Sequence, residues 1–170
     1  MATQTSSLIG ADLSGLGGTT QLFALGSVAF GDGGSEWQYV EVTSTLNTGK
    51  LVVIGAGGTA KVLTSGRFTA FASGVDIAAA QNQVNQGEFA WVAKRGRSLY
   101  VLTSASLTAG TYEAGYGIGA NSGRLIAGTN VAAGNTLLGI WVISSVQTAD
   151  FAPGVPTLAV FQWPRMVSGG

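Results

Sequence analysis

Residues 86–102 read QGEFAWVAKRGRSLYVL, and this stretch decides the class of fold. Successive side chains of an extended chain point to opposite faces. Phe89, Trp91 and Ala93 therefore share one face, while Ala90 and Val92 begin the other face, which ends at Lys94. Regular alternation of this kind, rich in aromatic and β-branched residues, predicts a β-strand.

The polar run Lys94-Arg95-Gly96-Arg97 interrupts this pattern, which resumes over Leu99–Leu102. A polar run that contains glycine is typical of a chain reversal, so we expect a β-hairpin with its turn at this run. The simplest interpretation of Lys94, Arg95 and Arg97 is a solvated tip. The functional interpretation is a docking site, because guanidinium groups bind carboxylates of a partner in a bidentate manner.

Short apolar runs separated by glycine-containing turns continue along the chain, which has 27 glycines. Residues 74–87 could instead form a helix capped by Asp76 and continued by the alanines that follow, but a strand over 75–81 fits its surroundings better. The pattern predicts an all-β fold, a single antiparallel β-barrel or sandwich with short strands and glycine-rich turns. The strands are expected within residues 22–30, 36–44, 50–54, 60–63, 67–73, 104–110, 112–119, 125–127, 135–144 and 157–163.

Residues 1–20 have no sustained hydrophobic period and are rich in glycine, serine and threonine. We expect an extended N-terminal arm here, followed by one β domain over residues 21–170. The arm is either a disordered leader or a segment that becomes ordered against a neighbouring subunit. In the second case its apolar residues would bind that partner, namely Leu8, Ile9, Leu13 and Leu16.

Charge is scarce, with eight basic and eight acidic side chains that make up 9% of the chain, against about 25% in an average soluble domain. A surface so poor in charge is expected to lie against other protein, so we expect a homo-oligomer. The zero net charge argues against nucleic-acid binding. No apolar run is long enough for a membrane-spanning helix, although alternating strands leave an outer-membrane barrel open. The first residues do not resemble a secretion signal, so we expect synthesis in a cytoplasm.

Catalytic chemistry has little support in the sequence, because cysteine and histidine are both absent. Their absence removes the usual triads and the commonest zinc ligands, and we expect no enzyme activity, cofactor or metal. Gly115, Gly117 and Ala120 match the loosest dinucleotide-binding spacing, but no helix is expected after them to hold a phosphate.

Four tryptophans, at positions 37, 91, 141 and 163, fall in different expected strands. We interpret them as residues of the core or of an intersubunit seam, because aromatic side chains dominate buried area where sheets pack. The alternative is a carbohydrate-binding β-sandwich that would use Trp37, Tyr39, Tyr112 and Tyr116 as stacking platforms.

The order of glycine, aromatic and β-branched positions over about residues 20–145 resembles the small head decoration, or cement, proteins of tailed bacteriophages. The residues that carry the resemblance are Gln21-Leu-Phe-Ala-Leu-Gly26, Asp32-Gly-Gly-Ser-Glu-Trp-Gln-Tyr-Val40, Ile77-Ala-Ala-Ala-Gln81, Gln86-Gly-Glu-Phe-Ala-Trp-Val92 and Arg95-Gly96.

This resemblance implies a β-rich subunit, often a homotrimer, that binds the major capsid protein. It would lie on the outer surface of the capsid lattice of the virion and stabilise the head by bridging capsomers. A structural protein of the tail or baseplate is an alternative that the sequence does not separate from this one.

Overall fold

The computed structural model describes residues 12–13, 15–63, 76–102, 110–111, 114–116, 123–126, 136–142 and 156–167. These residues form β-strands and one 3-10 turn, with no α-helix among them, so the predicted all-β class is confirmed. Within the same ranges no helix has the length and hydropathy needed to cross a bilayer. The predicted strand at 67–73 and most of that at 104–110 fall outside the described residues.

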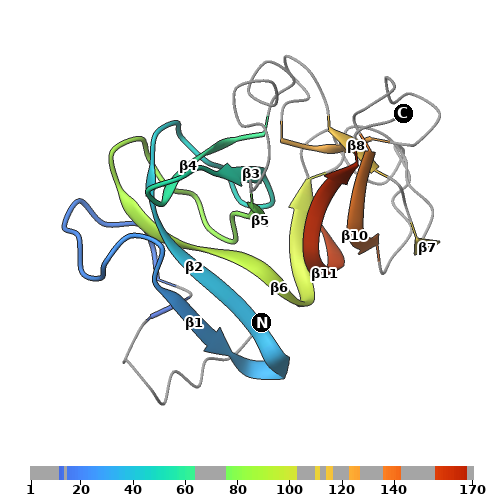
Figure 1. Cartoon of the computed structure of the whole chain (residues 1–170), viewed down its shortest axis with the longest axis horizontal. Helices are drawn as coiled ribbons and strands as arrows, with labels where there is room; N and C mark the ends of the chain where they lie inside the picture. Colours follow the sequence, from blue (N-terminus) through green and yellow to red (C-terminus); the bar gives the residue numbers. More distant parts are fainter. Residues whose placement is uncertain are drawn as a thin grey trace.

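The described chain contains eleven strands that belong to one continuous sheet (Figure 1). The strands are β1 Val28–Gly31, β2 Ser35–Val42, β3 Leu51–Ile54, β4 Thr59–Val62, β5 Asp76–Ala79, β6 Phe89–Leu102, β7 Gly110–Thr111, β8 Ala114–Tyr116, β9 Leu125–Ile126, β10 Thr136–Val142 and β11 Pro156–Val167. The 3-10 turn η1, Asp32–Gly34, lies between β1 and β2.

Five of these strands close into a barrel in the order β2-β4-β3-β5-β6, because β6 pairs back onto β2. The pair β2–β4 is parallel, whereas the other four pairs of the barrel are antiparallel. The barrel is therefore mixed, and the expectation of a purely antiparallel one is corrected. The reason is topological: the β3–β4 hairpin inserts with β4 against β2, which makes β4 run in the same direction as β2.

Small side chains line the barrel. Ala90 and Val92 from β6 meet Val40 and Val42 from β2 and Ala78 from β5, and all five are buried in one cluster. Alternation along each strand places these residues on the inner face, as the sequence predicts for β2 and β6. A narrow closed barrel leaves room for such small residues and for little else.

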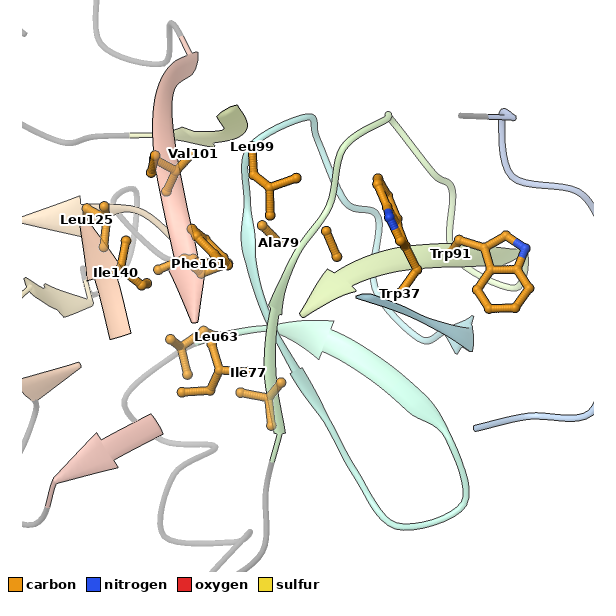
Figure 2. Packing of buried hydrophobic residues seen from close by; sticks show 14 of the residues in the cluster. Trp37, Leu63, Ile77, Ala79, Trp91, Leu99, Val101, Leu125, Ile140 and Phe161 are labelled. Atoms are coloured by element: carbon orange, nitrogen blue, oxygen red, sulfur yellow. The ribbon is translucent and has the colours of Figure 1, made fainter. Parts of the chain in front are cut away.

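The outer face of the barrel packs against a second set of strands and forms a larger hydrophobic cluster (Figure 2). Trp37 and Trp91 lie at one side of this cluster, and Leu125 and Ile140 lie at the other, with Phe161 of β11 between them. Both faces of the central strands are thus buried, which explains why β3 reads as an unbroken apolar run.

The predicted hairpin at residues 86–102 is wrong, because β6 is one continuous strand of 14 residues. Its first half pairs with β2 and its second half pairs with β11. The polar run that suggested a turn forms irregular pairing instead, with register shifts against both neighbours. Ser98, just beyond this run, has a positive φ of 58°. In Figure 1, β6 bends as it leaves the barrel and joins β11 and β10.

Two further expectations can be compared with the structure. Residues 76–79 form the strand β5, so the strand interpretation is confirmed and the alternative helix is wrong. The apolar run over 22–30 is a strand only from Val28 onward. The described part of the predicted arm contacts the barrel: Leu13 is buried in the outer cluster, and Gly18 pairs with Phe89.

Candidate functional site: the face around Glu36

Three charged side chains continue the inward faces of the barrel strands. Lys94 follows Ala90 and Val92 on β6, Glu36 precedes Val40 on β2, and Asp76 precedes Ala78 on β5. In the pairing of β2 with β6, Trp37 lies opposite Ala93 while Glu36 lies opposite Arg95, so Lys94 is an extra residue. This bulge turns Lys94 and Arg95 toward the same region.

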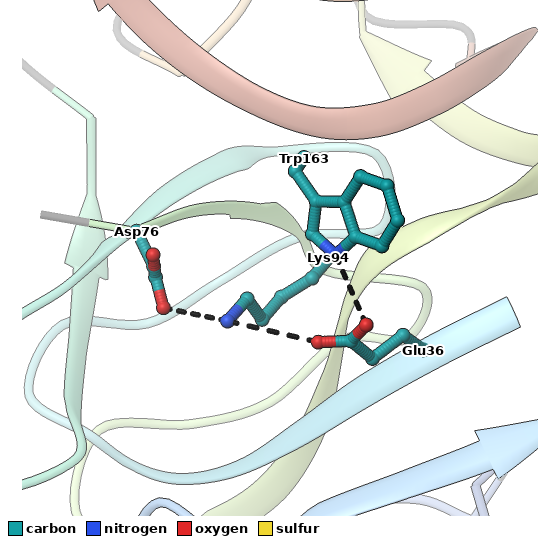
Figure 3. Close-up of polar contacts among 4 residues, drawn as sticks. All are labelled: Glu36, Asp76, Lys94 and Trp163. Carbon is teal, nitrogen blue, oxygen red and sulfur yellow. Dashed lines mark hydrogen bonds and ion pairs between the residues drawn. The ribbon is translucent and has the colours of Figure 1, made fainter.

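Lys94 bridges the two carboxylates (Figure 3). Its Nζ donates to Oδ2 of Asp76 at 2.6 Å and lies 3.8 Å from Oε1 of Glu36. The side chains of Lys94 and Glu36 are largely buried, whereas Asp76 is exposed. Partly buried charges need such partners because removing an ion from water is costly.

Trp163 of β11 lies over this cluster (Figure 3). Its Nε1 donates a hydrogen bond of 3.0 Å to Oε2 of Glu36, and the Arg95 guanidinium lies 4.5 Å from the centre of its ring. The indole is nevertheless 50% exposed. A stacked arginine and tryptophan that share a solvent-accessible surface are typical of residues that contribute strongly to protein–protein binding.

The backbone around Trp163 is irregular. Three residues, 162–164, stand opposite the single residue Gly139 of β10, and Trp163 has a left-handed φ of 46°. Gly139 also has a positive φ of 86°, and a Cβ added there would lie 2.6 Å from the carbonyl oxygen of Gln162. A strained conformation at a bulky residue persists only where the surrounding fold imposes it, and here it directs the indole outward.

Apolar side chains extend this face onto β1. Phe30 pairs directly with Glu36, and Val28 pairs with Gln38, so both lie on the same side of the sheet as Glu36. Phe30 is 60% exposed and Val28 is 41% exposed. We use the name Glu36 face for the three exposed residues Val28, Phe30 and Trp163 together with the partly buried charged residues Glu36, Lys94 and Arg95 between them.

The structure separates the residues that the sequence nominated for partner binding. Lys94 and Arg95 belong to the Glu36 face, whereas Arg97 is exposed beyond the bend of β6. Leu13 is buried in the core, so the prediction that its side chain would bind a partner is wrong. Leu16 is 82% exposed. Leu8 and Ile9 lie outside the described residues.

Sequence reasoning missed Trp163 and Phe30 as exposed residues. The tryptophans at 37 and 91 are buried, as the core interpretation predicts, but Trp163 is not. A positive φ caused by a bulge leaves no mark in the local sequence pattern. For Phe30 the signal was available, because position 30 alternates with the buried Ala29 on an end strand.

A carbohydrate platform that uses Trp37 and Tyr39 is wrong, because both side chains are buried in the hydrophobic core, where the Tyr39 ring packs against Phe23 and Trp91. The side chains of Tyr112 and Tyr116 lie outside the described part of the chain. Among the described residues there is also no group of three or more acidic, cysteine or histidine side chains arranged to hold a metal.

No protein-family model and no curated protein matches this chain. The Glu36 face must therefore be interpreted from its own chemistry. Lys94 is paired with Glu36 and Asp76, and the Arg95 guanidinium lies over the Trp163 ring. The exposed side chains of the face, Val28, Phe30 and Trp163, are apolar or aromatic. This arrangement suits contact with another protein surface better than capture of a small ion.

One further electrostatic feature lies away from this face. Burial, and then the nearby Arg124 guanidinium, lower the pKa of Lys50 below its usual value. Nε of Arg124 is buried and has no hydrogen-bond partner in the described part of the chain. Two cationic groups are thus held close together at the start of β3.

Proposed function

We propose that this chain is a structural protein of a virus particle, of the kind that decorates the heads of tailed bacteriophages. It would bind the major capsid protein on the outer surface of the virion and stabilise the head by bridging capsomers. It would be made in the host cytoplasm and act as a homo-oligomer, with a trimer favoured. Its role would be mechanical and would involve no bond making.

The observation that carries this proposal is the Glu36 face on a chain with so few charges. Tryptophan and arginine are the residues most enriched among those that dominate binding energy at interfaces. Trp163 and Arg95 are stacked and accessible, and Phe30 extends the apolar area beside them. Such a face can contact a shell protein while Lys94 and Glu36 stay paired with each other.

Repetition supports the mechanical role. A decoration protein makes many modest contacts at once over a regular lattice, and simultaneous engagement converts modest affinities into strong attachment. A surface with eight acidic and eight basic groups in total allows close approach at little cost of desolvation. Copies that bridge capsomers would oppose the outward pressure of packaged DNA.

The direct test is decoration of capsids that lack this protein. Purified chain is mixed with such particles, and attachment is measured by co-sedimentation and by electron microscopy. Trp163→Ala and Arg95→Glu, two changes within the Glu36 face, should each weaken attachment by about tenfold or more, because residues of this type dominate binding energy at interfaces. Leu22→Ser serves as the control, because Leu22 is 74% exposed but lies off the Glu36 face.

Thermal unfolding of each variant shows whether the domain remains folded. The temperature at which particles release DNA is then compared with and without bound protein. Wild-type attachment with equal release temperatures would rule out stabilisation of the head. Absence of attachment to any capsid would rule out the decoration role itself.

A further inference from the structure

Among the residues that the structure describes, the strand β1 lies at one end of the sheet order and pairs on one side only, with β2 (Figure 1). The Tyr39 N–H donates to the Ser27 carbonyl at 2.8 Å, while the Tyr39 carbonyl accepts from the Gly26 N–H at 2.8 Å. The position of Ser27 opposite Tyr39 therefore has the phase of a hydrogen-bonded pair. Such pairs recur at every second residue of an antiparallel ladder. The N–H and C=O groups of Val28 and Phe30 therefore point away from β2.

This outer edge lacks the features that normally prevent edge-to-edge pairing. The strand reads Val-Ala-Phe-Gly and contains no charged residue and no proline. Its two outward-pairing residues also carry its two exposed apolar side chains, Val28 and Phe30. The edge thus combines unpaired backbone groups with an apolar surface on one face of the sheet.

We propose that β1 pairs with β1 of a second copy of this chain, antiparallel and around a twofold axis. In this register Val28 lies opposite the partner subunit's Phe30, and Phe30 lies opposite the partner subunit's Val28. Ala29 lies on the axis. Each Val–Phe pair exchanges two backbone hydrogen bonds, and all four side chains lie on the same face of the joined sheets.

The edge fits itself for two reasons. The residues whose backbone N–H and C=O groups point outward, Val28 and Phe30, are two positions apart. A twofold axis through Ala29 therefore places Val28 opposite the partner subunit's Phe30, with the N–H and C=O groups of both residues directed at each other. A twofold contact also brings each side chain near its own copy, where like charges would repel. Because β1 carries no ionisable group, this contact has no such penalty.

The contact is small. Four-residue strands bury less than the roughly 1,200 Å² of a stable interface, so we expect a weak and reversible twofold contact, separate from the contacts that would hold the proposed trimer together. A covalent trap is the suitable probe. The chain has no cysteine of its own, so a single introduced thiol reports one position.

Val28→Cys and Phe30→Cys variants of the full chain, one carrying an affinity tag, are oxidised mildly alone and as a mixture. Opposite residues of a hydrogen-bonded pair have Cα atoms about 5.5 Å apart, within disulfide range, whereas two Val28 positions are diagonal and too distant. In the mixture the disulfide-linked heterodimer should therefore form about tenfold faster than the disulfide-linked homodimer forms in either variant alone. Leu22→Cys, which is exposed but off the edge, is the control.

Preferential heterodimer formation, with unchanged thermal unfolding of both variants, supports the twofold pairing. Trapping that is no faster in the mixture than in either single variant overturns it. So does a rate equal to that of Leu22→Cys. Because the experiment contains no capsid, its outcome is independent of the proposed decoration role.

Discussion

At the scale of single residues, close backbone approach sets the strongest constraints. Gly49 has a φ of +80°, and its carbonyl accepts a hydrogen bond of 2.8 Å from the Leu102 N–H at the end of β6. A Cβ added at Gly49 would lie 2.9 Å from that same nitrogen. The position therefore excludes a side chain for two reasons, its left-handed backbone and the adjacent strand.

We expect Gly49→Ala to lower the free energy of unfolding by about 2–4 kcal/mol, the sum of the left-handed conformation and the backbone clash. Urea denaturation measures the change. Gly57→Ala is a matched control, because Gly57 has a φ of +86° but nothing within 4 Å of an added Cβ. It should lose only about 1 kcal/mol. Equal losses in the two variants would show that the approach of Leu102 is unimportant.

The Lys50–Arg124 pair gives a prediction that depends on pH. Replacing Arg124 by Met removes the repulsion and also a buried Nε without a partner, so the variant should be more stable by about 1 kcal/mol at neutral pH. A lysine whose folded-state pKa is lowered binds its proton more weakly in the folded state than in the unfolded chain. Stability therefore rises as pH rises from the folded-state pKa toward 10.5.

In Arg124→Met the pKa of Lys50 moves back toward 10.5, so this rise should be smaller. The stability gap between variant and wild type should narrow at alkaline pH, where Lys50 is neutral and no longer repels Arg124. Urea denaturation over a pH series measures the gap. Arg97→Met, which removes an exposed arginine, is the control and should show a constant gap. A constant gap for Arg124→Met would contradict the coupling.

At the scale of elements, the bend of β6 determines how the barrel joins the second set of strands. Ala159 of β11 pairs with Leu99, and Phe161 pairs with Gly96, so β6 has one extra residue between these pairs. Ser98 lies in this bulge with a φ of 58°. On the other edge of β6, the Gln81 side-chain amide exchanges two hydrogen bonds with the backbone of Tyr100.

Ser98→Gly should stabilise the protein by about 0.5 kcal/mol, because glycine adopts positive φ without strain and this gain exceeds its entropy cost in the unfolded chain. Arg97→Gly is the matched change at the preceding exposed residue, which has no positive φ. It should destabilise by about 0.5–1 kcal/mol. Urea denaturation distinguishes the two, and effects of the same sign would contradict a strained bend at Ser98.

At the scale of the whole molecule, closure of the barrel leaves few exposed strand edges. Each of the five barrel strands pairs with a neighbouring strand on both of its edges, while β1 and β9 are the ends of the sheet order. The end strand β1 and the bulge of β11 both contribute to the Glu36 face, one through Phe30 and the other through Trp163. Attachment to a shell and pairing between copies are therefore separate predictions, although Val28 and Phe30 take part in both.

The sequence by itself determined the local geometry. Alternation assigned the two faces of β2 and the first half of β6, and a strand over 75–81 fitted the surrounding strands better than a helix. These conclusions depend on neighbours along the chain, and period-two patterns report them directly.

Only the tertiary structure decided whether residues 94–97 would form a hairpin turn or remain part of one continuous strand. A polar run with glycine suits both a hairpin turn and a bulge, and the choice depends on a partner strand, β11, that lies some sixty residues further along the chain. The parallel β2–β4 pair and the exposed indole of Trp163 have the same origin. Each depends on which strands meet, and pairing between distant segments leaves no periodic signal in either one.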